Sequence, residues 1–112
     1  MVDIICIGPV TLDKIITPGN TAEMAGGTSY YFSKAIRHTG TGYHLITSLS
    51  VRERRFVDDL RNEGIPVTVY ASAHTHFFEN IYPANTDHRV QRILGIGDPF
   101  PAAVLADINA SI

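Results

Sequence analysis

The chain has little cysteine, no long apolar run and no excess of basic residues, and each absence excludes a class of protein. Its one cysteine, Cys6, rules out an internal disulfide and any zinc site built from several thiolates. No apolar stretch reaches the roughly 20 residues that a membrane helix requires. The first residues lack the basic start of a signal peptide. We therefore expect a cytoplasmic protein without a membrane partner, and an inert core thiol at Cys6.

The charge balance and the missing phosphate-binding motifs narrow the function further. Nine Lys and Arg against eleven Asp and Glu give a net charge of −2, which argues against a nucleic-acid partner bound through bulk electrostatics. No P-loop is present, and no Gly-x-Gly-x-x-Gly follows the first apolar run, so a standard dinucleotide-binding fold is disfavoured. No linker, repeat or low-complexity segment divides the 112 residues. The chain reads as a single segment over 1–112, with enough apolar residues for a packed core.

The apolar patterning predicts strands alternating with helices in the first part of the chain. Short β-branched runs closed by turn residues indicate strands, and the first of them suits a sheet that is covered on both faces. The expected strands lie at 2–8, 12–16, 43–48 and 67–70, and the expected helices run from about 28 to 39 and from about 51 to 63. This rhythm is typical of an α/β domain with right-handed crossovers.

Capping residues mark the ends of both predicted helices. Thr28 or Ser29 can cap the first helix by accepting a hydrogen bond from its first turn. The segment 50–53, Ser-Val-Arg-Glu, has the pattern of a capping box for the second helix, in which serine and glutamate bond reciprocally to backbone N–H groups. Phe56, Val57 and Leu60 form its apolar stripe, and Gly64 is expected as its left-handed C-terminal cap.

The alternation of predicted strands and helices ends in the last third of the chain. Two longer strands, 74–82 and 88–94, flank a turn at 83–87 with no helix between them, so they are expected to pair as an antiparallel hairpin. A short helix is expected over 102–107, and 109–112 reads as the approach to another strand. The predicted fold class is therefore α/β: a partial Rossmann-like parallel sheet with flanking helices, plus an antiparallel β lid.

Two features suggest a ligand site. Gly26 and Gly27 precede a helix N-terminus, where backbone N–H groups can approach a ligand, although a tight turn into the helix explains them equally well. Asp13 follows the first strand and can accept hydrogen bonds from polyol hydroxyls, although a solvated surface carboxylate is the simpler reading. His74 and His76 alternate on a predicted strand without a convincing third ligand, so no metal site is predicted.

The order of these motifs resembles the N-terminal part of the ribokinase-like, phosphofructokinase-B-type carbohydrate kinases. The resemblance rests on Ile7-Gly8 followed by Asp13, and on the run from Ala25-Gly26-Gly27 to Gly40. It implies that Asp13 binds sugar hydroxyls and that Gly26 and Gly27 lie against the sugar. Tyr31 stands where the family often has a substrate-touching asparagine, which suits a different or larger polyol.

The resemblance also implies a lid, a cofactor and a partner. Strands around 12–24 and 74–95 would form the β lid over the sugar, through which several family members dimerise, and we expect a homo-oligomer formed through the lid or through exposed strand edges. ATP and Mg²⁺ are implied for the full-length enzyme. The segment 95–98, Gly-Ile-Gly-Asp, imitates the family's anion-hole signature, but it directly follows a lid-like strand. Asp98 is therefore not assigned as the base, and no catalytic residue is predicted.

Two functions remain open from the sequence. The favoured one is the substrate-binding N-terminal part of an ATP-dependent sugar or polyol kinase, inactive as this fragment because the ATP site and catalytic base are expected elsewhere. The alternative is a non-catalytic sugar-binding or dimerisation module that uses Asp13, Gly26 and Gly27 without chemistry.

Overall fold

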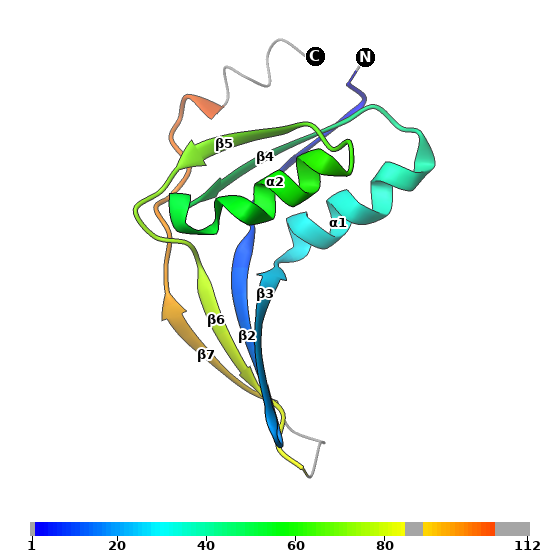
Figure 1. The fold of residues 1–112 in the computed structure, drawn as a ribbon. Coiled ribbons are helices and arrows are strands. Elements are labelled where there is room, and N and C mark those ends of the chain that lie inside the picture. The colour runs from blue at the N-terminus through cyan, green and yellow to red at the C-terminus, as the bar shows by residue number, and fades with distance from the viewer. Residues whose placement is uncertain (1, 85–88, 105–112) are drawn as a thin grey trace.

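Two β-sheets organise the chain, and the second extends away from one end of the first (Figure 1). The computed structural model describes residues 2–84 and 89–104. The first sheet is parallel, in the order β1–β4–β5, and the second, which we call the lid sheet, has the order β3–β2–β6–β7. The parallel strands are β1 (Ile4–Ile7), β4 (Tyr43–Leu49) and β5 (Val67–Ala71), and the lid strands are β2 (Thr11–Thr17), β3 (Asn20–Gly26), β6 (Phe77–Ile81) and β7 (Val90–Gly95).

Two helices, α1 (Thr28–Ile36) and α2 (Arg54–Asn62), cover one face of the parallel sheet (Figure 1). The predicted apolar stripe of α2 is confirmed, because Phe56, Val57 and Leu60 are all buried. They meet the buried residues of β4 and the start of β2 in one core, which also includes Val10 and Leu45. The α/β expectation is thereby confirmed.

The first strand is less buried than its sequence suggests. Ile4 and Ile7, at the two ends of β1, are exposed, although an apolar β-branched run predicts a strand covered on both faces. Ile4 and Ile7 are three residues apart and point to opposite faces, and β1 is an edge strand of the parallel sheet among the described residues, so neither side chain has a neighbouring strand on its outer side. The face without helices also has no layer against it among the described residues. Neither helix in the described part of the chain has the length and apolar character needed to cross a membrane.

The N-terminus of α1 differs from the prediction. The helix begins at Thr28 with Gly27 as its N-cap residue, and no side chain caps it. Instead of capping, the Ser29 hydroxyl donates a hydrogen bond of 2.6 Å to the carbonyl oxygen of Pro9. The expected cap by Thr28 or Ser29 is therefore wrong, and Ser29 ties the helix to the β1–β2 connection.

The start of α2 differs for a related reason. Ser50 Oγ accepts a hydrogen bond from the backbone N–H of Arg52, but the reciprocal bond from the Glu53 side chain is not formed. The backbone N–H of Ser50 donates to Thr75 Oγ1 at 2.8 Å, in a buried contact 25 residues away in sequence. The Thr75 hydroxyl thus accepts the hydrogen bond from the Ser50 N–H that the Glu53 carboxylate would accept in a capping box.

The C-terminus of α2 follows the prediction. Gly64 has φ of 84°, in the left-handed region. Its N–H donates to the carbonyl of Arg61, and the N–H of Ile65 donates to that of Leu60. This pair of bonds is the Schellman motif, which satisfies carbonyls at the end of a helix.

A buried hydrogen bond joins α1 to β4. The hydroxyls of Ser33 and Tyr43 lie 2.6 Å apart, and both residues are buried. Burial raises the pKa of the Tyr43 phenol to about 12. The phenol therefore stays neutral and keeps its hydrogen bond at physiological pH.

The lid sheet contains the predicted hairpin, but it is a mixed sheet. β6 pairs with β7 in antiparallel fashion, as expected, and β2 pairs with β3 in the same way. The two hairpins are joined by a parallel pairing of β2 with β6. Both strands leave the same end of the parallel sheet and therefore run in the same direction (Figure 1).

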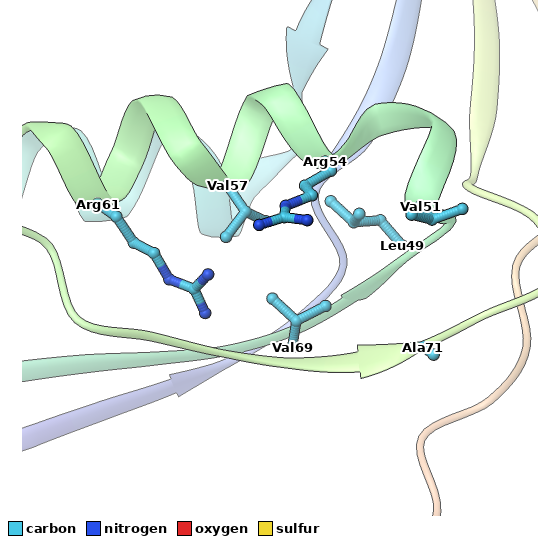
Figure 2. Close-up of a pocket in the computed structure, with 7 residues that line it drawn as sticks. All are labelled: Leu49, Val51, Arg54, Val57, Arg61, Val69 and Ala71. Atoms are coloured by element: carbon cyan, nitrogen blue, oxygen red, sulfur yellow. The ribbon is translucent and has the colours of Figure 1, made fainter.

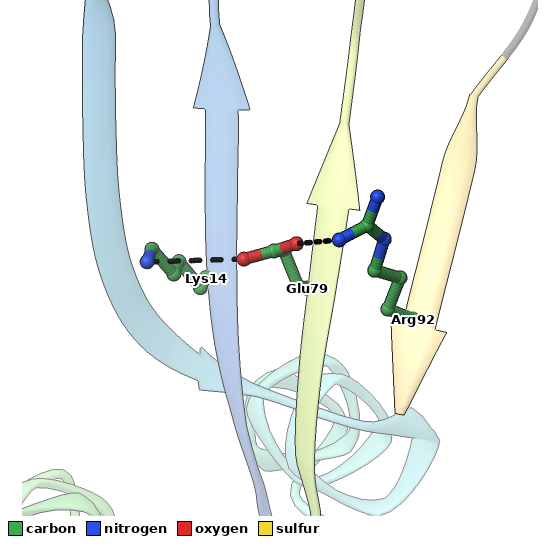
Figure 3. A network of polar contacts seen from close by, with 3 residues as sticks. All are labelled: Lys14, Glu79 and Arg92. Atoms are coloured by element: carbon green, nitrogen blue, oxygen red, sulfur yellow. Dashed lines mark ion pairs between the residues drawn. The ribbon is translucent and has the colours of Figure 1, made fainter. Parts of the chain in front are cut away.

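A row of charges crosses one face of the lid sheet (Figure 3). Glu79 on β6 lies 3.8 Å from Lys14 Nζ on β2 and 4.0 Å from an Arg92 guanidinium nitrogen on β7. Its side chain is only 12% exposed, and Glu23 on β3 extends the row in register with Lys14. Because successive side chains of a strand alternate, Asp13 and Phe78 lie on the opposite face.

Four predicted elements fall wholly or partly outside the described residues: the turn at 83–87, the first residue of the strand at 88–94, the short helix at 102–107 and the strand approach at 109–112.

Candidate functional site

A cavity of about 370 Å³ lies where β1 ends, α1 begins and the lid sheet starts. Its lining comes from three parts of the chain that are distant in sequence. The lining residues are Cys6, Ile7, Gly8, Pro9, Thr11, Gly27, Thr28, Ser29, His76 and Phe78. The carboxyl end of a parallel strand beside a helix N-terminus is a common place for ligands in α/β proteins.

Glycines let the backbone walls of this cavity come close together. Gly27 has φ of 95°, and a Cβ there would lie 3.0 Å from the carbonyl oxygen of Pro9. A Cβ on Gly8 would lie 3.2 Å from Ser29 Cβ. The first N–H groups of a helix have no acceptor within the helix, so the start of α1 presents donors and a partial positive charge at the cavity wall.

The Asp13 side chain, on β2, lies against Gly26 on the neighbouring strand β3. Thr11 Oγ1, whose residue lines the cavity, donates a hydrogen bond of 2.8 Å to Asp13 Oδ1. Thr11 is paired with Gly26 across β2 and β3. A Cβ on Gly26 would collide with Asp13 Oδ2, so the carboxylate occupies the space that a side chain would fill. The Thr11 bond fixes Oδ1, which orients the carboxylate beside the cavity.

The structure thus brings Asp13, Gly26 and Gly27 together, but it leaves Tyr31 apart from them. Tyr31 is 56% exposed on α1 and stacks edge-on against Tyr30, with ring centroids 5.4 Å apart. Of the four residues, only Gly27 lines the cavity, and Asp13 reaches its wall through the hydrogen bond from Thr11. The substrate-binding roles of Asp13, Gly26, Gly27 and Tyr31 all stay predictions.

The sequence analysis did not place several of the residues that line this cavity in a ligand site. Cys6, interpreted as a core thiol, is partly exposed and lines the cavity while packing on the core. His76 precedes β6 instead of alternating with His74 along it, and its Nδ1 accepts a hydrogen bond of 3.3 Å from the Gly97 N–H. Phe78 is paired with Asp13 across β6 and β2, which only the strand register reveals.

The segment that imitates an anion hole has a structural role. Asp98 Oδ2 accepts a hydrogen bond of 2.9 Å from the Ala73 N–H, and the Asp98 N–H donates to Ser72 Oγ at 2.8 Å. The Gly97 N–H is already bonded to His76. These bonds tie the end of the lid to the loop after β5, and they engage one Asp98 carboxylate oxygen and the Gly97 N–H in structural contacts.

The described residues contain no built metal site. Over 2–84 and 89–104, no three His, Cys, Asp or Glu side chains gather to hold a metal ion. In the segment that resembles a phosphate-binding loop, the Gly97 N–H is engaged by His76. No step through a nucleotide is therefore derived from this chain.

A second cavity, of about 230 Å³, lies between α2 and strands β4 and β5 (Figure 2). Apolar residues of β4, β5 and α2 form most of its wall, and the arginines Arg54 and Arg61 project over it. One Arg61 guanidinium nitrogen donates a hydrogen bond of 2.8 Å to the Val67 carbonyl. Arg61 thus links α2 to the start of β5.

No protein-family model and no curated protein sequence matches the chain, but solved structures do. A pyrophosphate-dependent kinase in the ribokinase family superposes with a TM-score of 0.76 at 25% identity, over 95% of this chain and 37% of that one. The chain has a ribokinase-like fold. The resemblance predicted from the sequence is confirmed, and the chain spans little more than a third of that kinase.

Two further structures show the same ribokinase-like fold. A ribokinase from Giardia lamblia gives a TM-score of 0.77 at 14% identity, over 99% of this chain and 42% of that one. A pyrophosphate-dependent myo-inositol-1 kinase gives 0.77 at 21% identity, over 95% and 34%. Replacement of one asparagine and one serine by leucine converts that enzyme into a myo-inositol-3 kinase.

Proposed function

We propose that this chain forms the substrate-binding part of a ribokinase-type kinase that phosphorylates a hydroxyl of a sugar or polyol. The observation that carries the proposal is the Asp13 carboxylate, held over Gly26 beside a cavity walled by Gly8, Gly27 and the start of α1. Oδ2 of that carboxylate can accept a hydrogen bond from a substrate hydroxyl. Such charge-assisted bonds are stronger than neutral ones.

Ring-shaped polyols are the substrate class that we favour. One structural neighbour was solved with a pyrophosphate analog and myo-inositol, and another, a nucleoside kinase from Burkholderia thailandensis, with inosine. The asparagine and serine that control regiochemistry in the myo-inositol-1 kinase lie eleven residues apart. Asn80 and Gln91 in this chain have the same spacing and pair across β6 and β7.

The phosphoryl donor is either ATP with Mg²⁺ or pyrophosphate. The sequence resemblance implies ATP, whereas the neighbour at 25% identity is pyrophosphate-dependent. We propose substrate binding and not phosphoryl transfer for this chain by itself, because it spans little more than a third of that kinase and the Gly97 N–H of its phosphate-loop-like segment is engaged by His76.

Replacing Asp13 with alanine is expected to weaken polyol binding by about 10- to 100-fold. A hydrogen bond to a charged group contributes about 1.5–3 kcal/mol, and the variant loses it. Isothermal calorimetry with a panel of sugars and inositols measures the change. Glu23→Ala is the matched control, since it removes an exposed carboxylate from the neighbouring strand on the other lid face. Equal affinities of the wild type and Asp13→Ala would refute the proposed site.

The second candidate is a non-catalytic sugar-binding or dimerisation module. It is favoured by the exposed apolar side chains at the β7 edge of the lid sheet, among them Ile93, Leu94 and Ile96. If a longer chain that contains these residues binds sugar but never consumes ATP or pyrophosphate, the module is correct and the kinase is not.

Both candidates predict self-association. β3 and β7 are the edge strands of the lid sheet, and an edge strand with exposed apolar side chains pairs readily with another chain. Sedimentation across a concentration series is expected to show a dimer or a higher oligomer. A monodisperse monomer at high concentration would argue against a partner bound through the lid.

A further inference from the structure

Strand β5 has an open edge in the part of the chain that the structure describes. The parallel sheet runs in the order β1–β4–β5, so in that part of the chain β5 has β4 on one side and no strand on the other. The Ser72 N–H donates a hydrogen bond of 3.2 Å to the Leu49 carbonyl on β4. Because backbone groups alternate in direction along a strand, the N–H and C=O groups of Val69 and Ala71 point away from β4, toward the open edge.

The first residue of this edge is already bonded to a side chain. Arg61 on α2 donates a hydrogen bond of 2.8 Å to the carbonyl of Val67. Val67 lies two residues before Val69 and therefore has the same outward direction. The contact agrees with an edge that no strand covers, and it leaves the backbone groups of Val69 and Ala71 for pairing with another chain.

The second cavity adjoins this open edge (Figure 2). Its apolar wall consists of Leu49, Val51, Val57, Val69 and Ala71. Every second side chain of a strand added beside β5 would face α2, because successive side chains alternate between the two faces of a sheet. An apolar side chain at such a position would be buried against this wall. The cavity can therefore receive one apolar side chain of an extended peptide.

The two arginines over the cavity favour an acidic occupant. Within the described residues Arg61 forms no ion pair, and the Val67 carbonyl that it contacts is neutral. Arg54 has one carboxylate nearby, that of Asp58 at 3.7 Å, and both side chains are largely exposed. Exposed ion pairs of this kind are weak. Both guanidinium groups can therefore bind an incoming carboxylate, which their planar shape suits.

A second copy of this chain fits the open edge less well than an acidic partner does. Antiparallel pairing of two β5 strands would continue the sheet with both α2 helices on the same face. Arg54 and Arg61 of the two copies would then be brought toward one another, and juxtaposed like charges disfavour a complex. A peptide with carboxylate side chains meets no such repulsion.

We propose that the open edge of β5 and the second cavity bind an extended acidic peptide segment of a partner protein. The segment adds a strand through the backbone groups of Val69 and Ala71, places an apolar side chain in the cavity and sets carboxylates against Arg54 and Arg61. In this mode of recognition main-chain bonds supply affinity and alternate side chains supply specificity. The matching segment has a carboxylate two residues from an apolar residue, because residues two apart share a face. The proposal does not depend on a polyol at Asp13.

Titration of the ¹⁵N-labelled chain with a capped hexapeptide tests the proposal by NMR. Threonine alternates in this peptide with glutamate, valine and glutamate, a pattern that reads the same in either strand direction. We expect the backbone N–H signals of Val69 and Ala71 to shift while those of Asp13 and Gly27 stay in place. A peptide with glutamine in place of both glutamates is expected to bind about 3- to 10-fold more weakly.

Three outcomes of this titration would overturn the proposal. Unmoved signals of Val69 and Ala71 at millimolar peptide would show that the edge takes no strand. Equal affinities of the glutamate and glutamine peptides would exclude an acidic occupant. Shifts of Val69 and Ala71 that depend on protein concentration without peptide would show that a second copy occupies the edge.

Two substitutions separate strand pairing from simple attraction of charges. Ala71→Pro removes a donor from the open edge and no bond to β4, and proline is tolerated on the outer side of an edge strand. It is expected to weaken binding of the glutamate peptide by at least about fivefold. Arg54→Gln is expected to weaken it by about threefold, and this variant carries the test even if Ala71→Pro does not fold.

Arg55→Gln is the matched control for Arg54→Gln. Arg55 is the next residue on α2, donates to the Arg52 carbonyl and does not line the cavity. We expect Arg55→Gln to keep the affinity of the wild type. Equal losses in Arg54→Gln and Arg55→Gln would show that the peptide is held by the general charge of the helix, and they would overturn the proposed site.

Discussion

Gly26→Ala is expected to abolish measurable polyol binding, with a loss of at least about 100-fold. The new methyl group would fall on Asp13 Oδ2. If the carboxylate turns aside to make room, it leaves its position over residue 26 and breaks the hydrogen bond from the Thr11 hydroxyl. The φ of Gly26 is not positive, so alanine adds no backbone strain there, and the effect falls on the carboxylate. A site displaced by about 1 Å can lose about 100-fold in function.

Calorimetry and urea unfolding separate the two consequences of this substitution. Gly95→Ala is the control within the lid sheet, because a Cβ there would meet Phe77 Cβ at an ordinary contact distance of 3.4 Å. We expect Gly95→Ala to keep both affinity and stability. If Gly26→Ala binds polyol as tightly as the wild type, the carboxylate over Gly26 is not part of the site.

Leu60→Ala is expected to lower the free energy of unfolding by about 2–5 kcal/mol. Leu60 is fully buried at the centre of the α2 stripe, and removing its methyl groups loses transfer free energy and leaves a cavity. A small α/β chain has a total stability of about 5–15 kcal/mol, so this change removes a large share of it. The loss also bears on function, because α2 packs on β5, from which the chain passes to the lid strand β6.

Urea denaturation measures this loss. Val51→Ala is the matched control, because Val51 is 77% exposed just before α2, and surface substitutions usually change stability by less than about 0.5 kcal/mol. Equal unfolding midpoints for Leu60→Ala and Val51→Ala would contradict the core described for this fold.

The sequence predicted the elements better than their partners. Strands β1, β4 and β5 and the stripe of α2 follow from local apolar patterning, and Gly64 follows from its position after a helix. The parallel pairing of β2 with β6 could not be predicted, because it joins strands about 60 residues apart and depends on where both leave the parallel sheet. The capping box at Ser50 failed for the same reason, since Thr75 competes for its backbone donor.

The candidate site also combines residues that local motifs predict with residues that only the strand pairing places. Asp13, Gly26 and Gly27 were recognised from motif order, and their contact follows from the β2–β3 hairpin, which is local in sequence. The motif position of Tyr31 does not determine which way its side chain points on α1, and it points to solvent. His76 and Asn80 come from a segment more than 60 residues after Asp13, so only the register places them on its face of the lid. Patterning alone carries no information about such a pairing.

A crystal structure of the chain soaked with the polyol that binds best would show directly whether Asp13 holds the substrate. We predict density for the ring between Asp13 and Gly27, with a hydroxyl within hydrogen-bond distance of Asp13 Oδ2. Density for the polyol in the second cavity, under α2, or on the charged lid face of Lys14 and Glu79, with none at Asp13, would contradict the proposed site.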